Sequence, residues 1–202
     1  WLMATPSGLL GKADAVGYAV CHRIGSHSFH LADRAMPLCA RCSGMHLGAL
    51  LGFLFQIKMG KRGGLPTRKF IVVFAAALLA FAFDGANSYL TLAGETGSSL
   101  PFLSSIQPLY EPQNWLRALT GILLGLGIAA ILFPILNQTL WRDWKPERAL
   151  STWKQLFALL VLGAAVEAAI LSENVLLLYP LAILSSFNVI LVLAMIYTIA
   201  WT

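Results

Sequence analysis

The sequence predicts an all-α, polytopic integral membrane protein: a bundle of about five transmembrane helices with a short Cys/His-rich N-terminal segment at the membrane surface. Its 202 residues are 58% hydrophobic and only 11% charged, whereas soluble globular chains are roughly 45–50% apolar and about 25% charged. Five stretches are long and apolar enough to cross a hydrocarbon core of about 30 Å. The composition excludes a disordered chain, a disulfide-dense secreted module and a nucleic-acid-binding protein, and indicates the lipid bilayer as partner.

The predicted elements follow in a simple order. Residues 1–42 form an interfacial segment, in which Leu9 to Val20 favours a short helix lying on the membrane. Residues 43–202 form the bundle, with spans expected at about 43–57, 70–92, 115–136, 152–171 and 175–201. Because the chain starts at Trp1 with no signal-peptide pattern, we expect the numbered chain to lack its true N-terminus.

The positive charges predict an orientation in the membrane. Links that are rich in Lys and Arg tend to be cytoplasmic. Under this rule the protein is a multi-pass protein of the cell (inner or plasma) membrane, with the Cys/His segment extracytoplasmic and the C-terminus cytoplasmic. The cations on which this depends lie in the first-to-second and third-to-fourth links: Lys58, Lys61, Arg62, Arg68 and Lys69, then Arg142, Lys145, Arg148 and Lys154.

Four polar residues fall within or beside the spans, all toward the outer face in this topology: Asp84, Asn114, Arg117 and Glu167. An ionised side chain at mid-membrane costs about 2.5–3.5 kcal/mol on insertion scales, so such groups face the bundle and pair. We expect Arg117 to lie between the two carboxylates. A structural ion pair and a proton or ion path are both consistent with this pattern.

Small residues recur at a spacing of four, at Gly44, Gly48 and Gly52 in the first span and at Gly121 and Gly125 in the third. This spacing places the glycines on one helix face, where a second backbone can approach closely. Helix packing is therefore predicted ahead of contact with a flat cofactor, and the first span is expected to be an interior or interface helix.

The densest chemical signal is the segment from Cys21 to His46, which holds every cysteine and histidine of the chain. In a Cys-x2-Cys pair such as Cys39 and Cys42, both thiolates can reach one tetrahedral ion. The hypothesis is a zinc site of the Cys3His type. Its ligands are Cys21, Cys39 and Cys42 with one histidine, which is His22, His30 or His46.

Other interpretations of the same segment stay open. Arg41 and a helix N-terminus lower thiol pKa values, which suits a redox-active dithiol at Cys39 and Cys42. In an oxidising compartment the pair forms a disulfide and leaves Cys21 free. His46, beside glycines, is also the residue to suspect of contacting a tetrapyrrole. Attachment of c-type haem is excluded, since Ser43 follows the second cysteine.

The motifs together resemble a family of uncharacterised small bacterial and archaeal membrane proteins, a domain of unknown function. The resemblance covers about residues 18 to 125 and implies no activity, and the region after about residue 137 carries no family motif. It rests on Cys21-His22, Ser28-Phe29, residues 36–44 (Met-Pro-Leu-Cys-Ala-Arg-Cys-Ser-Gly), Asp84-Gly85, and Asn114-x2-Arg117-x2-Thr120-Gly121. Met36 and Ser43 are departures from the family pattern.

These observations favour a non-catalytic accessory or assembly subunit of a larger membrane complex, respiratory or photosynthetic, whose N-terminal segment is clamped by metal. The chain has no recognised catalytic constellation, so no catalytic residue is assigned and an enzyme is not expected. One alternative is a membrane oxidoreductase that exchanges electrons between Cys39 and Cys42 and a lipid quinone. A weaker alternative is a small ion transporter, for which an inverted repeat is missing.

Overall fold

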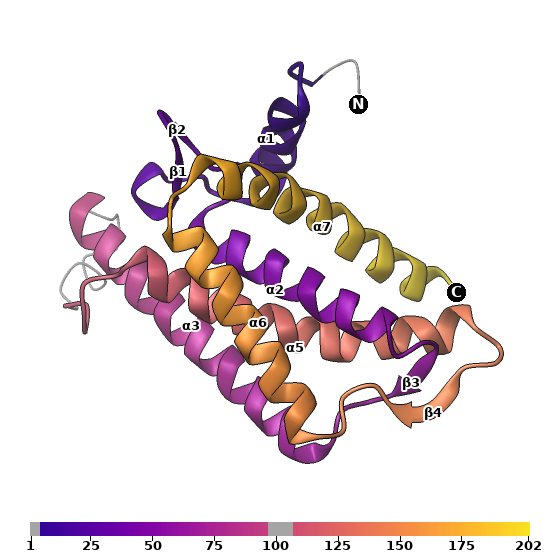
Figure 1. The fold of residues 1–202 in the computed structure, drawn as a ribbon. Coiled ribbons are helices and arrows are strands. Elements are labelled where there is room, and N and C mark those ends of the chain that lie inside the picture. Colours follow the sequence, from indigo (N-terminus) through magenta and orange to yellow (C-terminus); the bar gives the residue numbers. More distant parts are fainter. Residues whose placement is uncertain (1–4, 97–106) are drawn as a thin grey trace.

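The computed structural model describes residues 5–96 and 107–202, and within them the chain is mostly helical (Figure 1). A short helix α1 (Leu9–Val20) leads through a 3-10 turn, η1 (Gly25–His27), to a small antiparallel hairpin of β1 (His30–Leu31) and β2 (Arg34–Ala35). The longer helices are α2 (Ala40–Ile57), α3 (Arg68–Thr96), α5 (Asn114–Leu140), α6 (Trp153–Leu171) and α7 (Val175–Trp201). All five helices predicted as spans are present, as is the short helix over Leu9–Val20.

Within residues 5–96 and 107–202, four helices are long and apolar enough to cross a membrane: α3, α5, α6 and α7. The helix expected as the first span, α2, is not among them. Polar side chains at Arg41, His46 and Gln56 lower its apolar character, and it contacts α5, α6 and α7. The prediction of an interior helix is therefore confirmed, while a fifth crossing stays a prediction.

Glycines bring α2 and α5 into backbone contact. A Cβ atom added at Gly44 would lie 2.3 Å from the carbonyl oxygen of Ala118, and one at Gly48 would lie 2.3 Å from that of Ile122. From the other helix, a Cβ at Gly125 would lie 2.0 Å from the carbonyl oxygen of Met45. The predicted use of the glycine faces in helix packing is confirmed.

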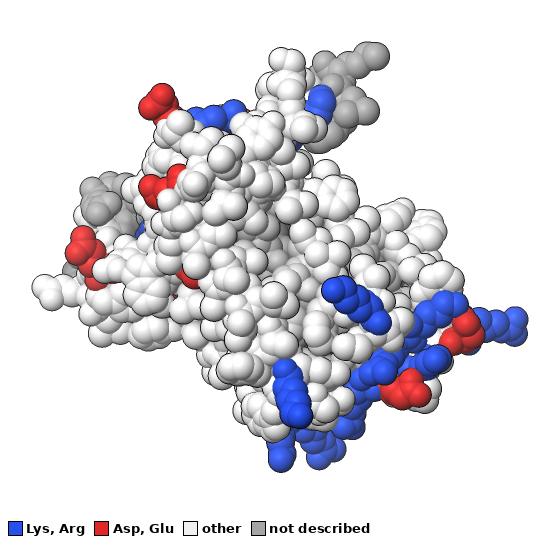
Figure 2. Space-filling view, viewed as in Figure 1, with Lys and Arg blue, Asp and Glu red and all other residues white. Residues whose placement is uncertain are grey.

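The two basic links lie side by side at one end of the bundle. Strand β3 (Arg62–Gly64) pairs in parallel with β4 (Lys145–Arg148), and Lys61 forms an ion pair of 2.9 Å with Asp143. Figure 2 shows Lys and Arg gathered at this end. The links thus share one side of the bundle, as the charge pattern requires, with α1 and the start of α2 toward the opposite end (Figure 1). Which end is cytoplasmic stays a prediction.

Candidate metal centre

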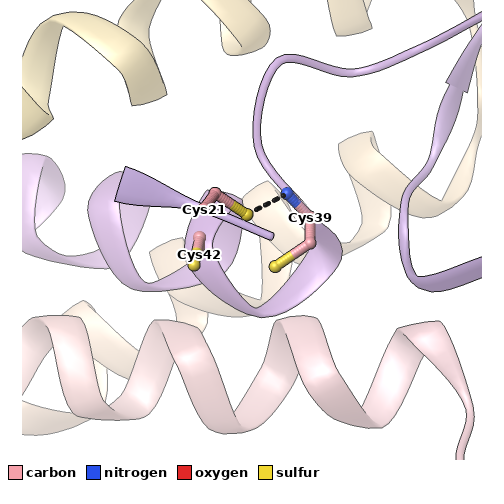
Figure 3. Close-up of side chains that lie close together, drawn as sticks. All are labelled: Cys21, Cys39 and Cys42. Carbon is pink, nitrogen blue, oxygen red and sulfur yellow. Dashed lines mark hydrogen bonds between the residues drawn. The ribbon is translucent and has the colours of Figure 1, made fainter. Parts of the chain in front are cut away.

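Three cysteines from two separate segments meet at the N-terminus of α2 (Figure 3). Cys21 follows the end of α1, Cys39 is the N-cap of α2, and Cys42 lies in its first turn. Their Sγ atoms all lie within 4.8 Å of one another, and the backbone N–H of Cys39 donates to the Sγ of Cys21 at 3.3 Å. All three thiols are free and partly buried. They are positioned to hold one metal ion.

Packing of α1 against the segment before α2 holds Cys21 in place. Gly17 approaches the segment before α2 so closely that an added Cβ would lie 2.0 Å from the carbonyl oxygen of Pro37. Asp14 in α1 pairs with Arg23 at 3.0 Å and also with Arg34 of β2. These contacts place Cys21 beside the two cysteines at the start of α2.

The three thiols do not have equivalent acidity. Hydrogen bonds from the Cys39 and Cys42 side chains lower the pKa of Cys21, and the backbone N–H of Cys39 acts in the same direction. The hydrogen bond with Cys21 raises the pKa of Cys39. Cys21 is thus the thiol most readily present as the thiolate, which is the form that binds metals.

The candidate histidines are not gathered in the same way. Among the residues that the structure describes, no histidine joins the cysteines within the same 4.8 Å. His22 follows Cys21 and is exposed beside the thiols, whereas His30 is exposed in β1. His46 is half-buried one turn after Cys42, and its carbonyl oxygen accepts a hydrogen bond of 2.8 Å from Nδ2 of Asn188. The fourth ligand of the predicted Cys3His set is therefore still open.

A cavity of about 280 Å³ adjoins the thiols. Its walls come from the segment after α1, the first turn of α2 and one face of α3, and they include His22, Arg41 and Ser88 as well as the cysteines. The cysteine cluster thus has a side that a small ligand or a water molecule can reach.

The second polar group centres on Asp84, which is 2% exposed and pairs with Arg41. Nη2 of Arg41 also donates to the hydroxyl of Ser88 at 3.0 Å, and the hydroxyl of Tyr110 donates to Asp84 at 2.8 Å. Burial and the hydrogen bond to Asp84 raise the pKa of Tyr110 to about 12, which keeps the phenol protonated as a donor. This group fastens α2 to α3 directly beside the cysteines.

The expected pairing of Arg117 is wrong. Its guanidinium donates to Oδ1 of Asn114 at 2.8 Å and to Ser88 at 3.5 Å, while Asp84 takes Arg41 as its ion-pair partner. The physical reason is that the first turn of α2 places Arg41 against α3, which the sequence spacing does not reveal. Asn114 also donates from Nδ2 to the carbonyl oxygen of Ser26 at 3.2 Å, which ties α5 to the Cys/His segment.

Glu167 stands apart from this network. Its side chain is buried in α6, and neither carboxylate oxygen has a hydrogen-bond partner among residues 5–96 and 107–202. Arg41, Ser88 and Tyr110 belong to the Asp84 network, and the sequence reasoning assigned none of them to it. Arg41 was considered only for its effect on the thiols. Asn188, whose amide donates to the carbonyl oxygen of His46, was also missed, and it is fully buried in the mostly apolar α7. A polar residue inside an apolar helix was the available signal for Asn188.

Comparison with known proteins gives a family but no activity. The family described as "Predicted membrane protein (DUF2085)" matches residues 21–131, which span the cysteines, α2, α3 and most of α5. An uncharacterised protein of Methanocaldococcus jannaschii is 26% identical over 133 residues, covering 65% of this chain and 72% of the relative. An uncharacterised protein of Methanothermobacter thermautotrophicus is 25% identical over 112 residues, covering 55% and 83%. No solved structure matches.

Proposed function

This chain belongs to the DUF2085 family of predicted membrane proteins, and we propose that it binds a thiophilic metal ion, zinc, through Cys21, Cys39 and Cys42. The observation that carries the proposal is the approach of three Sγ atoms to within 4.8 Å from segments on either side of a hairpin. Zn–S bonds of about 2.3 Å in a tetrahedron separate the sulfurs by about 3.8 Å. Movements of about 1 Å are enough to reach that geometry.

The cavity beside the three thiols offers room for a fourth ligand. His22 is the protein ligand that this placement favours, because it is adjacent to Cys21 and lines the cavity with the thiols. A water molecule, His46 one turn after Cys42 and His30 in β1 are the other candidates. A site with three protein ligands and one open position exchanges ligands more readily than a closed structural site.

The proposed role of the metal is to clamp the N-terminal segment to the bundle. Cys21 ends α1, whereas Cys39 and Cys42 begin α2, so one ion would close the loop formed by residues 22–38. Metal bonds of this kind contribute directly to folding free energy. Exposed Tyr18 and Leu9 on α1 would then be held in fixed positions, which suits contact with a partner subunit.

Loop accessibility tests the clamp. Trypsin cleavage at Arg23 and Arg34 should accelerate when a chelator removes the metal and slow again when zinc is returned. Cleavage at Lys58, at the opposite end of the bundle, is the internal control and should not change. In Cys39→Ser the loop should be cleaved rapidly with or without zinc. If neither chelator nor zinc changes the rate at which trypsin cleaves the wild-type loop, the clamp is refuted.

The accessory-subunit role is a further part of the proposal. Mild-detergent purification from native membranes should recover wild-type protein with stoichiometric membrane partners, and Cys39→Ser should lose them. Recovery of wild type free of any partner would contradict this role.

A thiol oxidoreductase is the second candidate, and the cavity beside three free thiols favours it. In that reaction Cys39 and Cys42 would form a disulfide, and their two electrons and two protons would reduce a quinone to the quinol. Thiol titration of reduced protein with and without a soluble quinone distinguishes the candidates. Loss of two thiols per chain with formation of one quinol would favour the oxidoreductase over the clamp.

A further inference from the structure

A second cavity, of about 430 Å³, lies at the basic end of the bundle, away from the cysteines. It is formed where the link before α3 meets the link before α6. Its polar lining consists of Thr67, Arg68, Lys69, Arg148 and Ser151.

The charges around this cavity have one sign. Three of its lining side chains are cationic, and none of its lining residues is acidic. Arg68, Lys69 and Arg148 take part in no ion pair within the part of the chain that the structure describes. By contrast, Lys61 in the same pair of links is satisfied by Asp143. The cavity therefore concentrates positive charge that the protein does not neutralise, which favours an anionic ligand.

Local backbone geometry adds to this preference. Helix α3 begins at Arg68 and helix α6 begins at Trp153, so the N-termini of both helices adjoin the cavity. A helix N-terminus carries partial positive charge and favours anions. The hydroxyls of Thr67 and Ser151 supply neutral donors beside the three cations.

The position of the cavity identifies the kind of anion. Both adjoining helices are candidate membrane spans, and their first two turns expose large apolar side chains, with Val72 67% and Phe157 68% exposed. Trp153 packs edge-to-face on Phe70 with ring centroids 5.1 Å apart, and tryptophan is typical of the membrane–water interface. An anion in the cavity would thus lie at headgroup level, with lipid-facing apolar surface next to it.

We propose that this cavity binds the phosphate of an anionic phospholipid headgroup, with Arg68, Lys69 and Arg148 as the charged contacts. Acyl chains of the bound lipid would lie along the exposed apolar faces of α3 and α6. Basic pockets between transmembrane helices are suited to such headgroups. This site is independent of the metal, and either assignment can fail without the other.

Lipid retention tests the proposal. Purified full-length protein is incubated in detergent with dioleoylphosphatidylglycerol, dioleoylphosphatidylcholine or sodium phosphate, and bound species are counted by native mass spectrometry. We expect retention of phosphatidylglycerol over phosphatidylcholine, with an apparent affinity about tenfold lower in Arg148→Gln and in Lys69→Gln. Arg142→Gln is the matched control, because it removes one charge from the same link but does not line the cavity.

Three results would overturn the assignment. Equal retention of the two lipids would show that the protein has no headgroup preference. Equal losses of affinity in Arg142→Gln and Arg148→Gln would show that the effect depends on net charge and not on the cavity. Binding of sodium phosphate that depends on Arg148, without retention of phosphatidylglycerol, would identify a free phosphate as the ligand instead. Tryptophan-fluorescence melting of each variant verifies that the loss is not due to unfolding.

Discussion

Gly125→Ala tests the close contact of α2 with α5, on which the position of the cysteines depends. The added Cβ would lie 2.0 Å from the carbonyl oxygen of Met45 and 2.6 Å from the backbone nitrogen of Ala49. Ordinary van der Waals contact begins at 3.4 Å, so the helices must separate locally by about 1.4 Å. Both clashing atoms belong to the backbone, so a side-chain rotation cannot relieve them. Overpacking of this kind costs about 1–3 kcal/mol.

The assay is the apparent melting temperature in detergent, followed by tryptophan fluorescence. A loss of about 2 kcal/mol corresponds to a decrease of about 4–8 °C for a chain of this size. The matched control is Gly94→Ala, in α3, where an added Cβ has nothing within 4 Å. The control should be neutral, or stabilised by about 0.5–1 kcal/mol, because alanine favours a helix. Equal melting temperatures for the two variants would refute the backbone contact.

Two further predictions concern the buried polar residues. Arg41→Gln should lower the free energy of unfolding by about 3–5 kcal/mol, because it leaves Asp84 buried without its cation. Asp84→Asn should cost less, since an amide still accepts from Tyr110; denaturant titration of both variants measures the order, and the reverse order would contradict the pairing. Glu167→Leu should raise the free energy of unfolding by about 1–3 kcal/mol, because neither carboxylate oxygen has a partner in the described structure. A lower melting temperature for Glu167→Leu would mean that the carboxyl group has a stabilising partner.

The helices were predictable because their signals are local. About 20 apolar residues in a row, or glycines four apart, specify a helix and its contact face without reference to the rest of the chain. The glycines at 44, 48 and 125 behave as this logic expects. The approach of Cys21 to Cys39 was also accessible, since a tetrahedral ion needs a ligand beyond one Cys-x2-Cys turn.

The remaining contacts depend on how distant segments dock. Arg41 pairs with Asp84, which lies 43 positions later in the sequence. Strand β3 pairs with β4 although the helices α3 and α5 separate them in the sequence. The free-energy cost of a charge inside the membrane made Asp84 and Glu167 equally good partners for Arg117. Only the rotation of α2 against α3 decides the pairing, and no local pattern encodes that rotation. The fourth metal ligand is also undetermined by the sequence, because it depends on how the segment after α1 docks against α2.

Metal content per chain is the decisive measurement for a zinc site at Cys21, Cys39 and Cys42. Wild-type protein and Cys21→Ser are purified in detergent under reducing conditions without added metal, and zinc, copper and iron are measured by inductively coupled plasma mass spectrometry. Melting curves first establish that the variant is folded. We expect one zinc ion per wild-type chain and its loss in Cys21→Ser. Reduced, folded wild-type protein without stoichiometric metal, or equal metal content in the variant, would contradict it.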